Sequence, residues 1–109
     1  MKSVITSTSD KLNAAFDRRF GRASWFCVYD DETQDTEFIE NSNLNASNGA
    51  GLKASEMMAE LGVTKVISGD FGPKAKQLLD KLGIQMVIVE EDDILIKDIL
   101  ERLNKASQN

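Results

Sequence analysis

Histidine is absent from the sequence, and cysteine occurs once, as Cys27. Without an imidazole the chain cannot form the Ser-His-Asp or Cys-His systems that activate a nucleophile. A zinc site of the usual cysteine and histidine kind is excluded too, because only one thiol could contribute. One thiol cannot form an internal disulfide, so we expect a cytoplasmic protein. Any chemistry would depend on carboxylates, hydroxyls, backbone amides or a bound cofactor.

Long hydrophobic runs and an excess of basic residues are also missing. No run approaches the roughly 18 apolar residues of a membrane span. Residues 1–20 hold charged side chains and no apolar block, so we expect no signal peptide. The formal net charge is -5, whereas a general nucleic-acid binder needs a basic face to displace counterions. We therefore expect neither a nucleic acid nor a membrane as a partner.

The composition is that of a folded domain. The chain has 109 residues, of which 41% are hydrophobic and 28% are charged. This length allows one ordinary core and leaves no room for a catalytic domain with a separate partner module. We expect a single domain over residues 1–109, with a flexible tail at about residues 106–109.

Hydrophobic periodicity predicts five strands and three helices. The expected strands cover residues 2–6, 23–30, 36–40, 63–68 and 84–89. The first two expected helices begin at residues 49–51 and at Pro73 and end at Gly62 and Gly83, and the third follows residue 93. Residues 11–20 stay ambiguous, because Leu12, Ala15 and Phe16 have helical spacing in a short stretch.

The second strand alternates between two faces. Cys27 lies on the face opposite Phe26 and Val28. Its position in the middle of the strand predicts a buried structural thiol, with a metal ligand as the alternative. Residues 36–40 return from a polar turn and are expected at an edge of the sheet.

The last strand and the acidic run after it lead to two further expectations. Residues 84–89 are nearly continuous in apolar side chains, which is typical of a buried strand. Glu90, Glu91, Asp92 and Asp93 then precede the third helix. We expect these acids to cap the helix and favour its positively polarised start, with an acidic metal site as the alternative.

A weak internal repeat indicates the topology. Leu61-Gly62-Val63 and the strand after it correspond to Leu82-Gly83-Ile84 and the next strand. Each copy is a helix end, a glycine cap and a core strand, so the strands are expected to be parallel with right-handed crossovers. The sequence predicts an α/β fold with a mixed five-stranded sheet flanked by helices. In this sheet, an N-terminal antiparallel hairpin is followed by βαβα units.

Three segments are expected to meet beyond the carboxyl ends of the parallel strands, where such sheets bind ligands. They are residues 18–22, 48–51 and 68–73. Together they would bring up to three arginines, several glycines and two helix N-termini to one crevice, which predicts an anion-binding pocket. The candidate binding residues are Arg19, Gly21, Arg22, Asn48, Gly49, Gly51, Gly69, Asp70 and Gly72. The alternative is that the arginines are solvated surface and the glycines serve only turns and packing.

These segments resemble a known family in their combination. Phe20-Gly21-Arg22-Ala23 before an aromatic strand is similar to the strand entry of the dinitrogenase iron-molybdenum cofactor biosynthesis family. Asn48-Gly49-Ala50-Gly51 resembles its Gly-Ala-Gly helix start, and the block from Leu61 to Ala75 resembles its Gly-x-x-Gly-Pro-x-Ala block. The order and spacing agree over nearly all of residues 1–105.

The resemblance implies a ribonuclease H-like motif and non-catalytic handling of iron–sulfur or iron-molybdenum cluster precursors. It also implies a cluster-donor or acceptor protein as a partner. Two positions depart from the family pattern, because Arg19 and Asn48 stand where members often have histidine. Arginine and backbone N–H groups could hold the sulfides of an anionic cluster without bonding to iron.

Other functions remain open at this stage. The pocket could hold another small anion, such as a nucleotide or a phosphorylated metabolite, although no phosphate-loop motif is present. The chain could also be a protein-interaction domain. A two-metal nuclease needs clustered carboxylates, and the first strand offers Thr6 and Ser7 instead. We therefore expect a binding protein rather than an enzyme.

Overall fold

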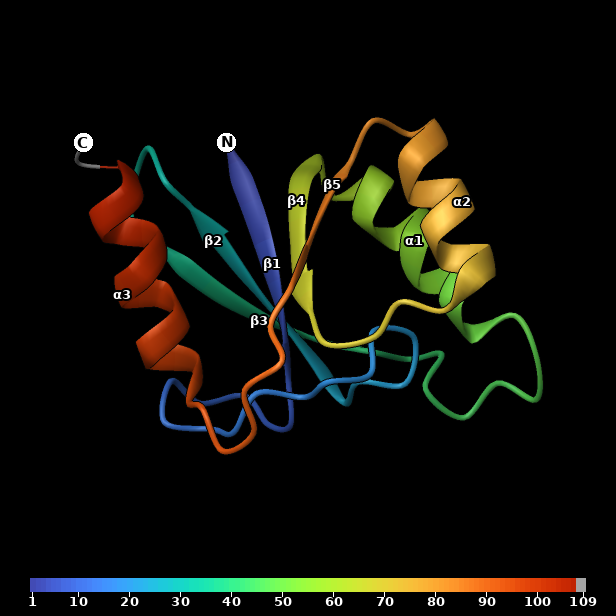
Figure 1. The fold of residues 1–109 in the computed structure, drawn as a ribbon, viewed down its shortest axis with the longest axis horizontal. Coiled ribbons are helices and arrows are strands. Elements are labelled where there is room, and N and C mark those ends of the chain that lie inside the picture. The colour runs from blue at the N-terminus through green and yellow to red at the C-terminus, as the bar shows by residue number, and fades with distance from the viewer. Residues whose placement is uncertain (108–109) are drawn as a thin grey trace.

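The computed structural model describes residues 1–107, which form a mixed five-stranded sheet flanked by helices, as predicted (Figure 1). The strands are β1 (Lys2–Ser7), β2 (Trp25–Asp30), β3 (Thr36–Glu40), β4 (Val63–Ser68) and β5 (Gln85–Ile88). The helices are α1 (Ala50–Glu60), α2 (Pro73–Lys81) and α3 (Ile96–Ser107). Residues 108–109 of the expected tail lie outside the described part of the chain. No helix within residues 1–107 is long and apolar enough to cross a membrane.

The order of the strands is β3-β2-β1-β4-β5. β2 runs antiparallel to β1 and β3, whereas β4 pairs in parallel with β1 and β5 in parallel with β4. In Figure 1, α1 and α2 lie on one side of the sheet and α3 on the other. Phe26 and Val28 join the core beneath α1 and α2, and Cys27 joins the core beneath α3. The predicted alternation of these three side chains is confirmed.

The two helix-to-strand steps repeat as the sequence predicts. Leu61 and Leu82 are the C-cap residues of α1 and α2, and each is followed by a glycine in the left-handed region. The φ angles of Gly62 and Gly83 are 74° and 72°, which residues with a Cβ adopt only at a cost. The chain then enters β4 or β5 beside the previous parallel strand.

Residues 11–20 do not form a helix. Ala14 and Phe16 are buried and Ala15 between them is exposed, so burial alternates over these three residues as in a strand. The Phe16 amide donates to the carbonyl of Ile94 at 2.9 Å. Pairing with the distant segment before α3 therefore replaces the local helix that the apolar spacing allowed.

β5 differs from the buried strand that its apolar residues predict. It lies at an edge of the sheet, next to β4 alone, and Ile88 is 51% exposed. Its alternate side chains still reach the two cores: Met86 packs into the core beneath α1 and α2, and Val87 packs into the core beneath α3. The apolar run thus reflects contacts on both faces and gives no information about the free edge. β3 lies at the other edge, as predicted.

The acidic run 90–93 does not cap α3, which corrects the expectation from the sequence. α3 begins beyond the run, and the carboxylate that receives an amide at its start belongs to Asp98, 3.2 Å from the nitrogen of Leu95. Two carboxylates of the run instead form ion pairs with arginines. Glu91 contacts Arg102 at 2.7 Å and Asp92 contacts Arg18 at 3.0 Å.

Candidate functional site

Backbone hydrogen bonds join the segment before β2 to the loop after β4. The carbonyl of Arg18 accepts from the amides of Gly69 and Asp70, at 3.1 and 2.6 Å. The amide of Phe20 donates to the carbonyl of Asp70 at 3.0 Å. Arg19 and Asp70 therefore form an isolated parallel β-bridge. This bridge extends the carboxyl-terminal rim of the sheet beyond β4.

The start of α1 packs against the same segment at Gly21. A Cβ at this position would lie 2.7 Å from the nitrogen of Gly51 and 2.9 Å from its Cα. Only a residue without a side chain allows this approach. Next to it, the ring of Phe20 packs against Phe26 and Phe71 with centroid distances of 6.2 and 5.3 Å. These contacts bring all three predicted segments to one rim.

Two adjoining hollows lie where the segments meet. The first, of about 290 Å³, is lined by Arg19, Phe20, Gly21, Arg22, Ala50, Gly51, Asp70, Phe71 and Gly72. The second, of about 260 Å³, shares Gly51 and Gly72 with it and adds Gly49. Asn48 and Gly69 line neither hollow, and Gly69 packs instead against Arg18. We refer to the two hollows together as the rim pocket.

The starts of α1 and α2 both face the rim pocket, and neither has a side-chain cap. The first intrahelical hydrogen bond of α1 runs from the Lys53 amide to the Gly49 carbonyl, and that of α2 runs from the Lys76 amide to the Gly72 carbonyl. At α1 the amides of residues 50–52 precede any intrahelical bond and can donate to a ligand. At α2 only those of residues 74 and 75 can, because Pro73 has no N–H and the Gly72 amide donates to the Asp70 carboxylate. α3 differs, because the Ile96 amide donates to the carbonyl of Ala14.

Arg19 is held at the rim of the pocket by Asp17. Its Nε and Nη2 donate to the two carboxylate oxygens of Asp17 at 3.2 and 3.1 Å. Asp17 is only 4% exposed, whereas the Arg19 side chain is 66% exposed. Hydrogen bonding to this carboxylate raises the pKa of Arg19, so the guanidinium stays charged while most of it faces solvent.

The other two arginines have different structural roles. Nη1 of Arg22 donates to the carbonyls of Leu44 and Ala46, at 2.8 and 2.6 Å, and ties down the loop before α1. The guanidinium of Arg18 turns to Asp92 and does not line the pocket. The expectation of up to three arginines around one crevice is therefore corrected to two, because an acid from the loop before α3 binds the third.

Two residues of the site were not singled out in the sequence. Asp17 holds Arg19, and its place two residues before an arginine is the signal that could have indicated this pair. Asn41 is fully buried, and its Nδ2 donates to the carbonyls of Gly21 and Ala23 at 3.1 and 2.8 Å. No local sequence pattern indicates that amide contact, since the partners lie on a different segment.

Cys27 lies apart from the rim pocket. It is fully buried in the core beneath α3, and burial raises the pKa of its thiol to about 12. Within residues 1–107, no group of three or more histidine, cysteine or acidic side chains could hold a metal ion. The rim pocket thus offers backbone and guanidinium donors, and its lining includes neither a thiolate nor an imidazole.

We expect Cys27 to resist alkylation in the native protein at pH 8 and to react readily in denaturant. The reason is that the thiolate is the reactive form, and the folded chain keeps the proton. The contribution of this thiol to the free energy of unfolding should be constant below the ordinary thiol pKa of 9.0 and fall as the pH rises toward about 12, so the difference from Cys27→Ser should change only in that range. Iodoacetamide labelling followed by mass spectrometry measures the first effect. Rapid labelling of the native wild type, but not of Cys27→Ser, would contradict it.

The fold and the rim pocket define a class of small α/β proteins with a mixed sheet and a glycine-lined pocket at its carboxyl-terminal rim. The family described as dinitrogenase iron-molybdenum cofactor matches residues 1–106, and the chain belongs to this family. The resemblance found in the sequence is confirmed.

Solved structures that share the fold include the following two. The apo form of the orange protein from Desulfovibrio gigas is 29% identical, with a TM-score of 0.88 over 97% of this chain and 88% of that chain. A candidate NifB protein from Thermotoga, solved by NMR and placed in the DUF35 family, is 24% identical. Its TM-score is 0.81 over 97% of this chain and 89% of that chain, and this likeness shows the fold alone. No curated protein matches the sequence.

Proposed function

We propose that this protein binds and carries an anionic iron–sulfur or iron-molybdenum cluster, or a precursor of one, without catalysing a reaction. The observation that carries the proposal is the meeting of two uncapped helix starts and the Arg19 guanidinium at one pocket. Helix starts and guanidinium groups both attract negative charge. Membership of the iron-molybdenum cofactor family supports a metal–sulfur cluster as the cargo.

The donors of the rim pocket favour a cargo held by hydrogen bonds rather than by bonds to the metal. Backbone amides at residues 50–52 and the guanidinium of Arg19 can donate to the sulfides at the cluster surface. The thiol of Cys27 is buried in the core beneath α3. A cargo held in this way can leave without the exchange of a metal ligand, which suits a protein that receives a cluster from a donor and passes it to an acceptor.

We further propose that the fold is the ribonuclease H-like motif, used here without nuclease chemistry, and that the protein works in the cytoplasm. The strand order and the antiparallel direction of β2 support the motif. A two-metal nuclease needs metal-binding carboxylates, and at the end of β1 this chain has the fully buried hydroxyl residues Thr6 and Ser7 instead. The hydroxyl of Thr6 donates to that of Ser68 at 2.9 Å, which is a packing role.

Two substitutions at the pocket are expected to change cluster affinity in opposite directions. Arg19→Gln removes a positive charge at the rim, so affinity should fall about tenfold. Asp70→Asn removes a negative charge and keeps the oxygen that accepts from the Gly72 amide, so affinity should rise. Arg18→Gln is the matched control, because it removes the same charge from a side chain that faces Asp92. Anaerobic titration with a preassembled iron–sulfur cluster, followed by iron analysis and visible absorbance, measures the affinities.

Equal affinity in Arg19→Gln, Asp70→Asn and the control would contradict the rim pocket as the binding site. If the protein takes up no iron from the cluster but gains thermal stability from ATP or inorganic phosphate, the ligand is a phosphate-containing molecule and not a cluster. The same three variants would then show whether that ligand occupies the same pocket.

A further inference from the structure

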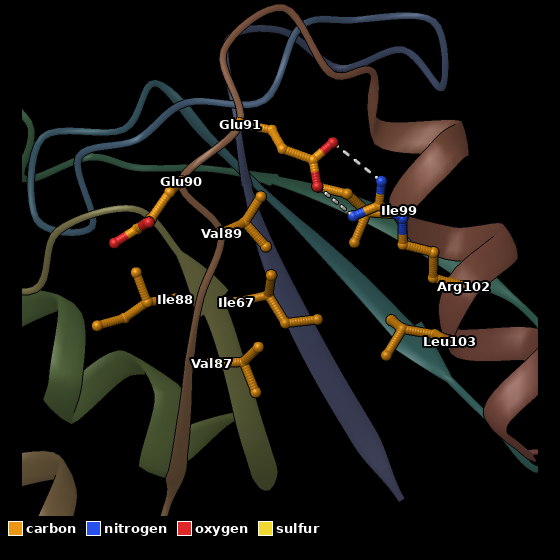
Figure 2. A pocket seen from close by; sticks show the side chains of 9 residues that line it. All are labelled: Ile67, Val87, Ile88, Val89, Glu90, Glu91, Ile99, Arg102 and Leu103. Carbon is orange, nitrogen blue, oxygen red and sulfur yellow. Dashed lines mark hydrogen bonds and ion pairs between the residues drawn. The ribbon is translucent and has the colours of Figure 1, made fainter.

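The free edge of β5 borders an apolar groove on the α3 side of the sheet. The groove has a volume of about 570 Å³ and is lined by Ile67, Val87, Ile88, Val89, Glu90, Glu91, Ile99, Arg102 and Leu103. Figure 2 shows Ile67 and Val87 facing α3 across the groove, with the Glu91–Arg102 ion pair at one end. The groove is larger than the rim pocket, yet its walls are mainly aliphatic, so it suits a protein surface better than an anion.

The backbone of β5 leaves a set of hydrogen-bonding groups without a partner strand. The Val89 amide donates to the Ser68 carbonyl in β4 at 3.0 Å, so the backbone groups of Val89 and Val87 point toward β4. Successive residues of a strand direct these groups to opposite sides. The N–H and C=O groups of Met86 and Ile88 therefore point away from the sheet.

The two edges of the sheet differ in how well they are protected from pairing. β3 carries Glu37 and Glu40, and charged residues discourage another strand from adding at an edge. β5 has the sequence Gln-Met-Val-Ile, without a charge or a proline. Leu82 just before it and Ile88 at its end are 43% and 51% exposed. An uncharged edge flanked by exposed apolar side chains is a surface that favours strand addition.

We propose that a second copy of this chain pairs with β5 in the antiparallel direction about a two-fold axis at Val87. Only residues with outward-pointing groups can exchange hydrogen bonds across such an edge. Centring the axis on Val87 places Met86 of each copy opposite Ile88 of the other. All the outward N–H and C=O groups of both copies are then used, and the two sheets form one continuous sheet.

The charges at the two ends of β5 complement each other in this arrangement. Lys81 lies at the end of α2 before the strand, and Glu90 lies just after the strand; both are exposed. Neither forms an ion pair within residues 1–107. An antiparallel pair brings the beginning of β5 in one copy to the end of β5 in the other. In this register residue 81 of one copy lies opposite residue 93 of the other, so Lys81 is brought toward the acidic run 90–93 of its partner, as a self-complementary interface requires.

Sedimentation equilibrium from micromolar to millimolar concentration tests this interface. The wild type should form a concentration-dependent dimer. Ile88→Lys places a charge at the exposed apolar edge, and its dimer dissociation constant should rise at least about tenfold. Leu12→Lys is the matched control, because Leu12 is 47% exposed and lies away from β5, and it should dimerise like the wild type. Lys81→Glu should weaken the dimer, and adding Asp93→Lys should restore it.

Amide hydrogen exchange tests the register itself. The amides of Met86 and Ile88 should exchange slowly in the dimer and rapidly at dilution, because each donates only across the interface. The proposal is overturned by a wild type that stays monomeric at millimolar concentration, by equal effects of Ile88→Lys and Leu12→Lys, or by a dimer in which these two amides stay unprotected. None of these measurements involves anion binding, so they stand apart from the proposed function.

Discussion

Phe20→Ala is expected to lower the free energy of unfolding by about 4 kcal/mol, since truncating a buried aromatic side chain leaves a cavity. Phe20 is fully buried and contacts the rings of Phe26 and Phe71. It also lines the rim pocket between Arg19 and Gly21. The residue therefore connects the core beneath α1 and α2 to the candidate site, and its loss should weaken both.

Urea unfolding followed by the fluorescence of Trp25 measures this effect. Phe20→Leu keeps most of the volume and should cost about half as much as Phe20→Ala. Leu12→Ala removes an exposed apolar side chain and should change stability by less than about 0.5 kcal/mol. If Phe20→Ala were no more destabilising than Leu12→Ala, the close packing of the three aromatic rings would be wrong.

Gly21→Ala is expected to cost about 3 kcal/mol, because its methyl group meets backbone atoms that cannot rotate away. The added Cβ would lie 2.7 Å from the nitrogen of Gly51 and 3.0 Å from the carbonyl carbon of Ala50. Relief requires the start of α1 to move away from the segment before β2. The same movement separates the two walls of the rim pocket, so affinity for an anion should fall together with stability.

Gly49→Ala separates this clash from the general cost of replacing a glycine. Gly49 has a φ of 72°, and a Cβ there would have no atom within 4 Å. The expected cost is about 1 kcal/mol, which comes from backbone conformation alone. Chemical denaturation gives the two free energies, and amide chemical shifts of residues 50–52 report movement of α1. Equal costs for both variants would show that the close approach at Gly21 is absent.

Periodicity was sufficient to predict most of the elements. β4 was predicted with both ends correct, and α2 begins at Pro73 as the sequence indicates. These elements have alternating or helical apolar patterns and end in glycine or proline, which determine backbone conformation locally. Local signals of this kind are readable in one sequence because their causes lie within a few residues.

Contacts between distant segments account for what the sequence could not show. Residues 11–20 pair with the chain before α3, and nothing in their own pattern identifies that partner. The edge position of β5 depends on the order of the whole sheet. In the same way, the residues of the rim pocket could be grouped from topology, but the direction of Arg18 depends on Asp92, an acid in a distant segment.

The backbone bonds between residues 18–20 and residues 69–70 have a mechanical consequence. They continue the sheet beyond its strands and give the rim pocket a stiff floor. A rigid pocket floor cannot close around a bound anion, so the anion would keep one side exposed to water. Under the proposed function, another protein could contact that exposed side while the anion is still bound, and the anion could pass directly to it.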